Sequence, residues 1–306
     1  MARIIFMGTP EYACRILERI WSPDDEWLVV TKPDMPVGRR QVMTPSTVAV
    51  WAEEHHLTVV KPVRLKDYSK PWTDFQPDWI LTAAYGRILQ PWVLQLPRWG
   101  ALNLHASLLP RWRGANPIAW AIRSGDAMTG VTLMAMDSGV DTGAIVATAE
   151  TPILPQDTTG TLTDRLAEVA AGLWVSTREK WGEGPWPSYP QPHQGVTMAP
   201  KFEPQAGHLD WQKSARELDA WVRSMTPEPG AYTMLDNLRI KILRAEALEA
   251  LVDSEPGLAV LSQDQWRVAT GAGTLLVSQI HPAGRRPMSP GEFVRGRRGE
   301  ALWTLH

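Results

Sequence analysis

The sequence predicts an α/β fold, a doubly wound and mostly parallel sheet of the Rossmann-like type, followed by a small OB-like β-barrel domain. The apolar run at residues 3–7 ends in Gly8, and a helical pattern follows it, which is the usual opening of such a sheet. Strand-like and helical segments then alternate as far as residue 180. Beyond a proline-rich stretch, short strand-like segments with turn residues between them favour a small barrel.

The domain boundaries follow from length and from proline content. A chain of 306 residues favours two domains over one. Six prolines interrupt the periodicity between residues 182 and 204, which is typical of a linker. We therefore expect an N-terminal domain at residues 1–181, a linker at 182–204 and a C-terminal domain at 205–306.

The elements of the first domain are predicted from apolar runs and helical spacing. Residues 79–84 are apolar except for Thr82, as in a strand that is buried on both faces. Residues 32–45 are predicted to form a loop, because they hold three prolines and Gly38. The expected strands are 3–7, 27–30, 58–60, 79–84, 101–105 and 131–136, and the expected helices are 11–20, 47–56, 115–123 and 161–180.

The second domain is predicted to begin with a helix and to continue as short strands. The helix covers residues 214–225. Turn signals at Asp236-Asn237 and at 271–273 separate the strands that follow. The expected strands are 231–235, 238–245, 258–261, 266–269 and 275–280, and about five short strands fit a small barrel of the OB type.

Composition excludes several classes of protein. The net charge of −2 argues against a generally basic nucleic-acid binder, although a local basic patch is compatible with it. The single cysteine, Cys14, permits no disulfide within the chain and favours a reducing cytoplasm. No segment has the roughly 18 apolar residues of a membrane helix. The seven histidines lack the spacing of metal ligands, so we expect no metal.

The densest group of polar residues lies at 103–114. Asn103 and His105 are two positions apart, so their side chains share one face of a strand. An amide and an imidazole can both donate to an oxyanion, and the imidazole can also carry a proton. Asp141, in the glycine-containing loop 137–143, could orient His105 and stabilise its charge.

Each of these pieces is ambiguous by itself. An Asn-x-His pair at a strand end is usually structural, and Asp141-Thr142-Gly143 is usually a turn. An aspartic protease would need two such loops, and the sequence has one. Gly8 begins neither a G-x-G-x-x-G motif nor a P-loop, so dinucleotide binding is poorly supported.

The order and spacing of the motifs are more specific. The string from Asn103 through His105, Ser107-Leu108-Leu109-Pro110 and Trp112-Arg113-Gly114 resembles the motif of the 10-formyltetrahydrofolate-dependent formyltransferases, as does Val140-Asp141-Thr142-Gly143 downstream. Further stretches resemble the branch of this family that acts on methionyl-tRNA, and they run in order over nearly the whole chain. They are residues 6–11, 32–39, 84–89, 113–118, 129–132 and 282–289.

The resemblance implies a formyltransferase type of Rossmann-like domain and a specific reaction. The α-amino group of the methionyl ester would attack the formyl carbon of 10-formyltetrahydrofolate directly. Asn103 and His105 would stabilise the tetrahedral oxyanion, and Asp141 would hold His105 and help to move the proton. The residues expected to contact the folate are Ser107, Leu108, Leu109, Pro110, Ala84, Tyr85, Gly86, Ile88, Asp137 and Gly139.

The resemblance also implies that initiator methionyl-tRNA is the partner. We expect the protein to be a monomer. The loop at 32–45 would contact the acceptor end through Arg39 and Arg40. This loop is about one residue shorter than is usual in the branch. In the second domain, Lys241, Arg285 and Arg286 are the expected phosphate contacts.

Two alternatives remain open. A formyltransferase acting on the amine of a sugar nucleotide would use the same catalytic residues, because specificity resides in the parts appended to the fold. A Rossmann-like module that binds a nucleotide or RNA without catalysis is the second alternative.

Overall fold

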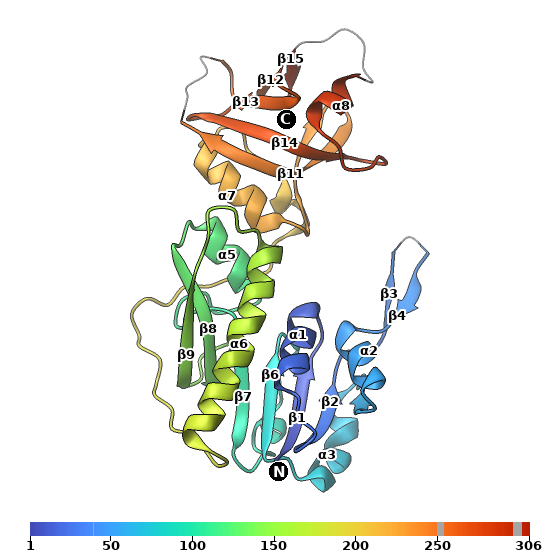
Figure 1. Ribbon diagram of the computed structural model, residues 1–306, viewed down its shortest axis with the longest axis vertical. Coiled ribbons are helices and arrows are strands. Elements are labelled where there is room, and N and C mark those ends of the chain that lie inside the picture. Colours follow the sequence, from blue (N-terminus) through green and yellow to red (C-terminus); the bar gives the residue numbers. More distant parts are fainter. Residues whose placement is uncertain (39, 250–253, 296–301) are drawn as a thin grey trace. The chain divides into compact units, whose positions relative to one another are not determined.

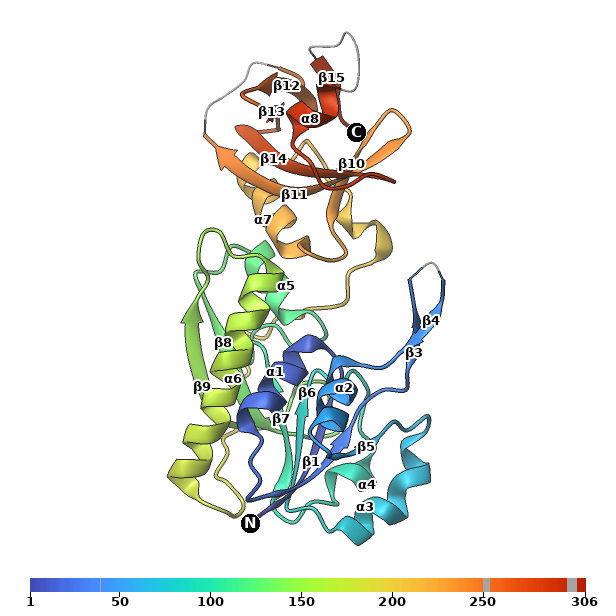
Figure 2. The same ribbon diagram turned by 45° about the vertical axis from the view of Figure 1, so that its right-hand side comes forward.

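The computed structural model describes residues 1–38, 40–249, 254–295 and 302–306, and these residues form two compact units (Figures 1 and 2). Unit 1 comprises Met1–Pro117, Met128–Pro152 and Thr163–Pro200. Unit 2 comprises Ile118–Ala127, Ile153–Leu162 and Lys201–His306. The domain boundaries proposed from the sequence at 181 and 205 stay predictions.

A seven-stranded sheet forms the centre of unit 1, and its order β5-β2-β1-β6-β7-β8-β9 confirms the predicted fold class (Figures 1 and 2). The pairs from β5 to β7 are parallel, whereas β8 runs antiparallel to both β7 and β9. The strands are β1 (Arg3–Gly8), β2 (Glu26–Val30), β5 (Thr58–Val60), β6 (Trp79–Ala83), β7 (Gly100–His105), β8 (Met128–Ala135) and β9 (Ile145–Pro152).

Helices cover both faces of this sheet. On one face, Ile5 and Ile80 pack in a core cluster with Trp72 of α3 and Val93 of α4. On the other face, the ring of Trp79 contacts the ring of Trp174 in α6. The helices are α1 (Glu11–Ile20), α2 (Thr47–Glu54), the 3-10 turn η1 (Leu65–Tyr68), α3 (Ser69–Phe75), α4 (Pro91–Leu94) and α6 (Thr159–Trp181).

Helix α1 illustrates why the helical predictions hold. Its buried residues include Ala13, Ile16, Leu17 and Ile20, which repeat at the spacing of one helical face. On its exposed side, Arg15 forms an ion pair with Asp164 of α6 at 3.4 Å. The two helices therefore lie side by side over the same face of the sheet (Figures 1 and 2).

Several local predictions were wrong. The predicted loop at 32–45 contains an antiparallel hairpin of β3 (Met35–Val37) and β4 (Val42–Thr44). Strand β9 was not predicted, because its alternating Ala, Thr and Glu give it little apolar character. Its backbone hydrogen bonds to β8 stabilise it as a strand, although its own sequence has little strand character. Helices α3 and α4 were also missed.

The proline-rich stretch packs onto unit 1 as far as residue 200. The ring of Trp186 lies 5.0 Å from that of Trp79 and 5.2 Å from that of Trp174. Further along, Tyr189 exchanges two backbone hydrogen bonds with Ile145 at the start of β9. Buried aromatic surface and backbone pairing thus hold this part of the predicted linker against the sheet.

Unit 2 is built on a curled antiparallel sheet of order β10-β11-β14-β13-β12-β15. Met234 of β10 and His306, just after β15, exchange two backbone hydrogen bonds and so join the two edges of the sheet. This closure agrees with the predicted OB-like barrel. The strands are β10 (Ala231–Leu235), β11 (Leu238–Leu248), β12 (Leu258–Ser262), β13 (Gln265–Ala269), β14 (Thr274–Pro282) and β15 (Leu302–Thr304).

Helix α7 packs on the barrel core through Leu218, Val222 and Met225. It begins with a reciprocal capping box between Ser214 and Glu217, a signal that is readable in the sequence. The other helices are α5 (Pro117–Arg123), the 3-10 turn η2 (Pro204–Gly207) and α8 (Pro290–Arg295). Among the described residues, no helix has both the length and the apolar character needed to cross a membrane.

Candidate active site

Asn103 lies on β7, and its carboxamide is oriented by the neighbouring strand. The hydroxyl of Thr82 on β6 donates to its Oδ1 at 2.8 Å. Strands β6 and β7 are parallel and pair Thr82 with Asn103, so this contact follows from the register of the sheet. Within the part of the chain that the structure describes, no acceptor is bonded to Nδ2, which leaves both of its hydrogens available to a ligand.

His105 is the last residue of β7 and is 6% exposed. Its Nε2 lies 2.9 Å from the carbonyl oxygen of Trp112. A carbonyl only accepts, so Nε2 carries the proton, and in the neutral ring Nδ1 is the basic nitrogen. Nδ1 lies 3.6 Å from Oδ2 of Asp141. The ring is therefore oriented to take up a proton at the nitrogen that faces a carboxylate.

Asp141 is held by the loop that follows β7. Its Oδ2 accepts from the backbone N–H of Gly114 at 2.8 Å. The backbone of Asp141 is left-handed, with φ of 53°, a conformation that costs about 1–2 kcal/mol in a residue with a side chain. Gly114 has φ of 121°, and a Cβ there would lie 2.8 Å from the carbonyl oxygen of Ala199. Only glycine fits at position 114.

Three loops carry the residues expected to contact the folate. In the loop after β7, Ser107 is fully buried and its hydroxyl donates to the carbonyl of Arg111, whereas Leu108 and Pro110 are half-buried and Leu109 is buried. Oγ1 of Thr132 donates to the carbonyl of Ser107 and accepts from the N–H of Leu109, which fixes this turn.

The second of these loops follows β6 and the third follows β8. Ala84, Gly86 and Ile88 are exposed, while Tyr85 is buried, and this burial raises the pKa of its phenol. Asp137 accepts from the N–H of Gly139 at 2.9 Å and from the hydroxyl of Thr142 at 2.7 Å, so its carboxylate shapes the turn. Among the described residues, Asp141 joins the loop after β8 to His105. No hydrogen bond or ion pair of the described residues joins the loop after β6 to His105.

The residues expected to contact tRNA lie in both units. Arg39 falls outside the described residues, and Arg40 is exposed at the turn between β3 and β4. Lys241 on β11 is 3.3 Å from the carboxylate of Glu228. Arg286 pairs with Glu292 at 3.0 Å, and the guanidinium of Arg285 lies over the ring of Phe293 at 5.7 Å.

Sequence reasoning missed the contribution of residues 189–199, the segment that crosses the loops of the site. Gln191 in this segment is 8% exposed and bonds to both loops. The hydroxyl of Thr197 accepts from the N–H of Trp112 at 2.9 Å. A proline-rich stretch gives no signal of such contacts, because they join residues far apart in the sequence. Arg113 and Gln191, for example, are 78 positions apart.

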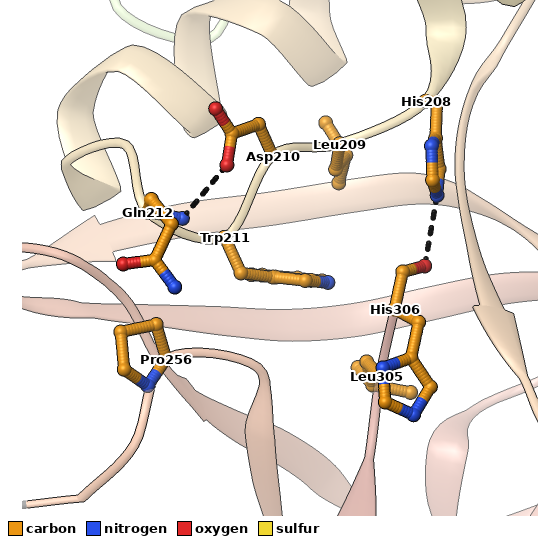
Figure 3. Close-up of a pocket in the computed structure, with 8 residues that line it drawn as sticks. All are labelled: His208, Leu209, Asp210, Trp211, Gln212, Pro256, Leu305 and His306. Carbon is orange, nitrogen blue, oxygen red and sulfur yellow. Dashed lines mark hydrogen bonds between the residues drawn. The ribbon is translucent and has the colours of Figure 1, made fainter.

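Unit 2 contains a hollow of about 410 Å³ (Figure 3). It is lined by His208, Leu209, Asp210, Trp211, Gln212, Pro256, Leu305 and His306, and it includes none of the residues predicted from the sequence. In the described ranges, no three side chains of His, Cys, Asp or Glu come together as a group that could hold a metal ion.

Gly143→Ala is expected to lower the melting temperature by roughly 5–10 °C, since overpacking a backbone contact costs about 2–3 kcal/mol. A Cβ at this position would lie 1.7 Å from the carbonyl oxygen of Ala135. Gly172→Ala on α6 is the control, because a Cβ there meets nothing within 4 Å and alanine favours the helix. Thermal unfolding of both variants checks this, and equal melting temperatures would contradict it.

Known families and structures match the chain over most of its length. The family model described as formyl transferase matches residues 2–177, and the model of the formyl transferase C-terminal domain matches residues 201–298. The methionyl-tRNA formyltransferase of Marinobacter nauticus is 39% identical over 298 residues, which cover 96% of this chain and 96% of that protein.

Two solved structures share the fold at low identity. An N-formyltransferase from Helicobacter canadensis, in complex with folinic acid and dTDP-3-aminofucose, is 17% identical with a TM-score of 0.70, covering 92% of this chain and 100% of that one. A methionyl-tRNA formyltransferase from Clostridium thermocellum is 15% identical with a TM-score of 0.59, covering 80% and 93%. At these identities the likeness supports the fold alone.

Proposed function

The chain belongs to the formyl transferase family, and we propose that it transfers the formyl group of 10-formyltetrahydrofolate to the α-amino group of initiator methionyl-tRNA. The proposal rests on identity near 40% to methionyl-tRNA formyltransferases over 96% of the chain. The geometry of Asn103, His105 and Asp141 suits the chemistry, because an amide donor and an oriented imidazole–carboxylate pair stand on one strand and its neighbouring loop.

Asn103 is proposed to stabilise the oxyanion. When the amine adds to the formyl carbon, the formyl oxygen becomes negative and needs hydrogen-bond donors that are already in place. Thr82 engages Oδ1 of Asn103 and leaves Nδ2 as that donor. The protein does not have to reorganise as the charge develops, because the orientation of the amide is set within the sheet.

His105 is proposed to accept a proton from the attacking amine at Nδ1. The protonated ring hydrogen-bonds the oxyanion and then gives the proton to N10 as the bond between the formyl carbon and N10 breaks. The proton on Nε2 is committed to the carbonyl of Trp112. Asp141, 3.6 Å from Nδ1, then stabilises the imidazolium electrostatically. Direct attack by the amine needs no covalent enzyme intermediate, so no nucleophilic side chain is required.

The folate is proposed to lie against the three loops that follow β6, β7 and β8. Their exposed residues, Ala84, Gly86 and Ile88 in one loop and Gly139 in another, offer backbone groups that could read the polar edge of a pterin. Membership of the formyl transferase family supports a folate as the formyl donor. That the donor is the 10-formyl derivative, and that these loops hold it, is the proposal.

The tRNA is proposed to contact the β3–β4 hairpin and the basic residues of unit 2. Arg40 stands at the tip of the hairpin, where it is exposed, and Lys241, Arg285 and Arg286 lie in unit 2. Phosphate contacts of this kind weaken as salt increases, because counterions are released on binding. A reducing cytoplasm suits the single cysteine, and we propose a cytoplasmic monomer.

The pure protein is expected to transfer labelled formyl from 10-formyltetrahydrofolate to initiator methionyl-tRNA, with little transfer to elongator methionyl-tRNA. Acid-gel or filter assays of the labelled tRNA measure this. A dTDP-linked amino sugar is the competing acceptor, since a distant structural relative was crystallised with such a compound. Preferred transfer to the sugar would establish the alternative function, and transfer to neither acceptor would refute the proposal.

A further inference from the structure

We propose that Gln191 is a positioning residue for formyl transfer, and that its carboxamide clamps the two catalytic loops so that Asp141 faces His105. This inference rests on the proposed function. Gln191 belongs to the segment of residues 189–199, which continues unit 1 beyond α6. Its side chain is buried against both loops of the site. It touches no reacting atom, so it would act through Asp141.

Both ends of the carboxamide are fully used. Its Nε2 donates to the carbonyl of Asp141 and to the carbonyl of Gly143, each at 2.8 Å. Its Oε1 accepts from Nε of Arg113 at 3.0 Å and from the terminal NH2 group of Arg113 at 2.6 Å. Flipping the amide would set oxygen against two carbonyls and NH2 against a guanidinium, so the contacts allow one orientation.

The clamp acts at the point where the loop is strained. Asp141 has a left-handed backbone, and its carbonyl is one of the two that Gln191 holds. On the opposite side, Oδ2 of Asp141 accepts from Gly114, the residue after Arg113. The loop after β8, which carries Asp141, and the loop after β7, which carries Arg113 and Gly114, are therefore linked twice. The carboxylate of Asp141 makes one link, and Gln191 bonded to Arg113 makes the other.

The rest of the segment strengthens this linkage. Arg113 donates its N–H to the carbonyl of Thr197, and Ala199 donates to the carbonyl of Arg113. The side chain of Thr197 accepts from the N–H of Trp112, whose carbonyl holds Nε2 of His105. Residues 189–199 thus support both partners of the His105–Asp141 pair, and Gln191 bonds to both loops.

Gln191→Ala is expected to lower kcat roughly tenfold to a hundredfold while KM for each substrate changes less than about threefold, because a small misplacement of a catalytic group is costly. Gln191→Glu keeps the acceptor for Arg113 but puts carboxylate oxygen against two carbonyls, so it is expected to fail at least as badly. Gln194→Ala is the matched control, since Gln194 is exposed in the same segment.

A double-mutant cycle with Asp141→Ala separates positioning from general destabilisation. If Gln191 acts through Asp141, Gln191→Ala lowers kcat less than about threefold further in the Asp141→Ala protein. A general structural defect would lower kcat by the same factor in both backgrounds. Thermal unfolding of every variant identifies any that fails to fold, and Gln191→Glu serves if Gln191→Ala is such a variant.

Hydrogen–deuterium exchange of residues 137–143 gives a readout that needs no activity. Gln191→Ala is expected to increase exchange in this loop several-fold, and Gln194→Ala is expected to leave it unchanged. Unchanged exchange, or a loss of kcat by the same factor in both backgrounds of the cycle, would overturn the clamp. An inactive wild-type protein would overturn the proposed function, and the exchange measurement would still decide whether Gln191 holds the loop.

Discussion

His105→Ala is expected to lower kcat for formyl transfer at least about a hundredfold, because general acid–base catalysis by a placed imidazole contributes 10²–10⁴-fold. The ring is 6% exposed, its tautomer is set by the carbonyl of Trp112, and its basic nitrogen faces Asp141. KM for the folate and for the tRNA should change little, because the ring acts on the proton rather than on binding. Steady-state kinetics with methionyl-tRNA measure both constants.

The control for this experiment is His193→Ala, because His193 is an exposed histidine of unit 1 outside the proposed catalytic group. Asn103→Ala should lower kcat by a similar factor, because it removes a hydrogen-bond donor to the oxyanion and one such donor is worth about 2.7–4 kcal/mol. If His105→Ala retained more than about a tenth of the wild-type kcat, the assignment of this site would be wrong.

Asp141→Asn is expected to lower kcat about a hundredfold without unfolding the loop. The amide oxygen can still accept from the N–H of Gly114, so the local hydrogen bond survives while the charge beside Nδ1 of His105 is lost. Asp141→Ala removes both. Loss of the stabilised imidazolium is the main effect in each variant, so the two should show similar kcat values and differ in melting temperature.

Asp164→Asn is the control for loss of a carboxylate, since Asp164 pairs with Arg15 at the surface of unit 1. A different result would be equally informative. If Asp141→Asn kept nearly full kcat while Asp141→Ala lost it, the carboxylate would serve to hold the loop, and the electrostatic role proposed for Asp141 would have to be abandoned.

The elements that the sequence predicted are those with strong local patterns. Helix α1 and strand β6 were found at or within one residue of their expected ends, because their apolar residues repeat at the period of the structure they form. Strand β9 and the β3–β4 hairpin were missed for the opposite reason. Their residues are weakly apolar or exposed, and the pairing partner supplies the stabilisation.

In the candidate site, too, local patterns could be predicted and tertiary contacts could not. Asn103 and His105 could be placed together from the sequence, because positions two apart on a strand share a face. Motif spacing also suggested Asp141. The contacts that orient these groups could not be predicted, because the hydroxyl of Thr82, the carbonyl of Trp112 and the amide of Gln191 reach the site through tertiary packing.

The sequence by itself therefore determined the fold class and the family resemblance, since these depend on local periodicity and on ordered motifs. It also proposed the catalytic side chains, and their roles stay predictions. Only the tertiary structure decided which nitrogen of His105 is basic and which segment holds Asp141. A hydrogen bond between Arg113 and Gln191, 78 positions apart, leaves no periodic trace in the chain. It exists because folding brings two loops and a proline-rich segment together at one end of strand β7.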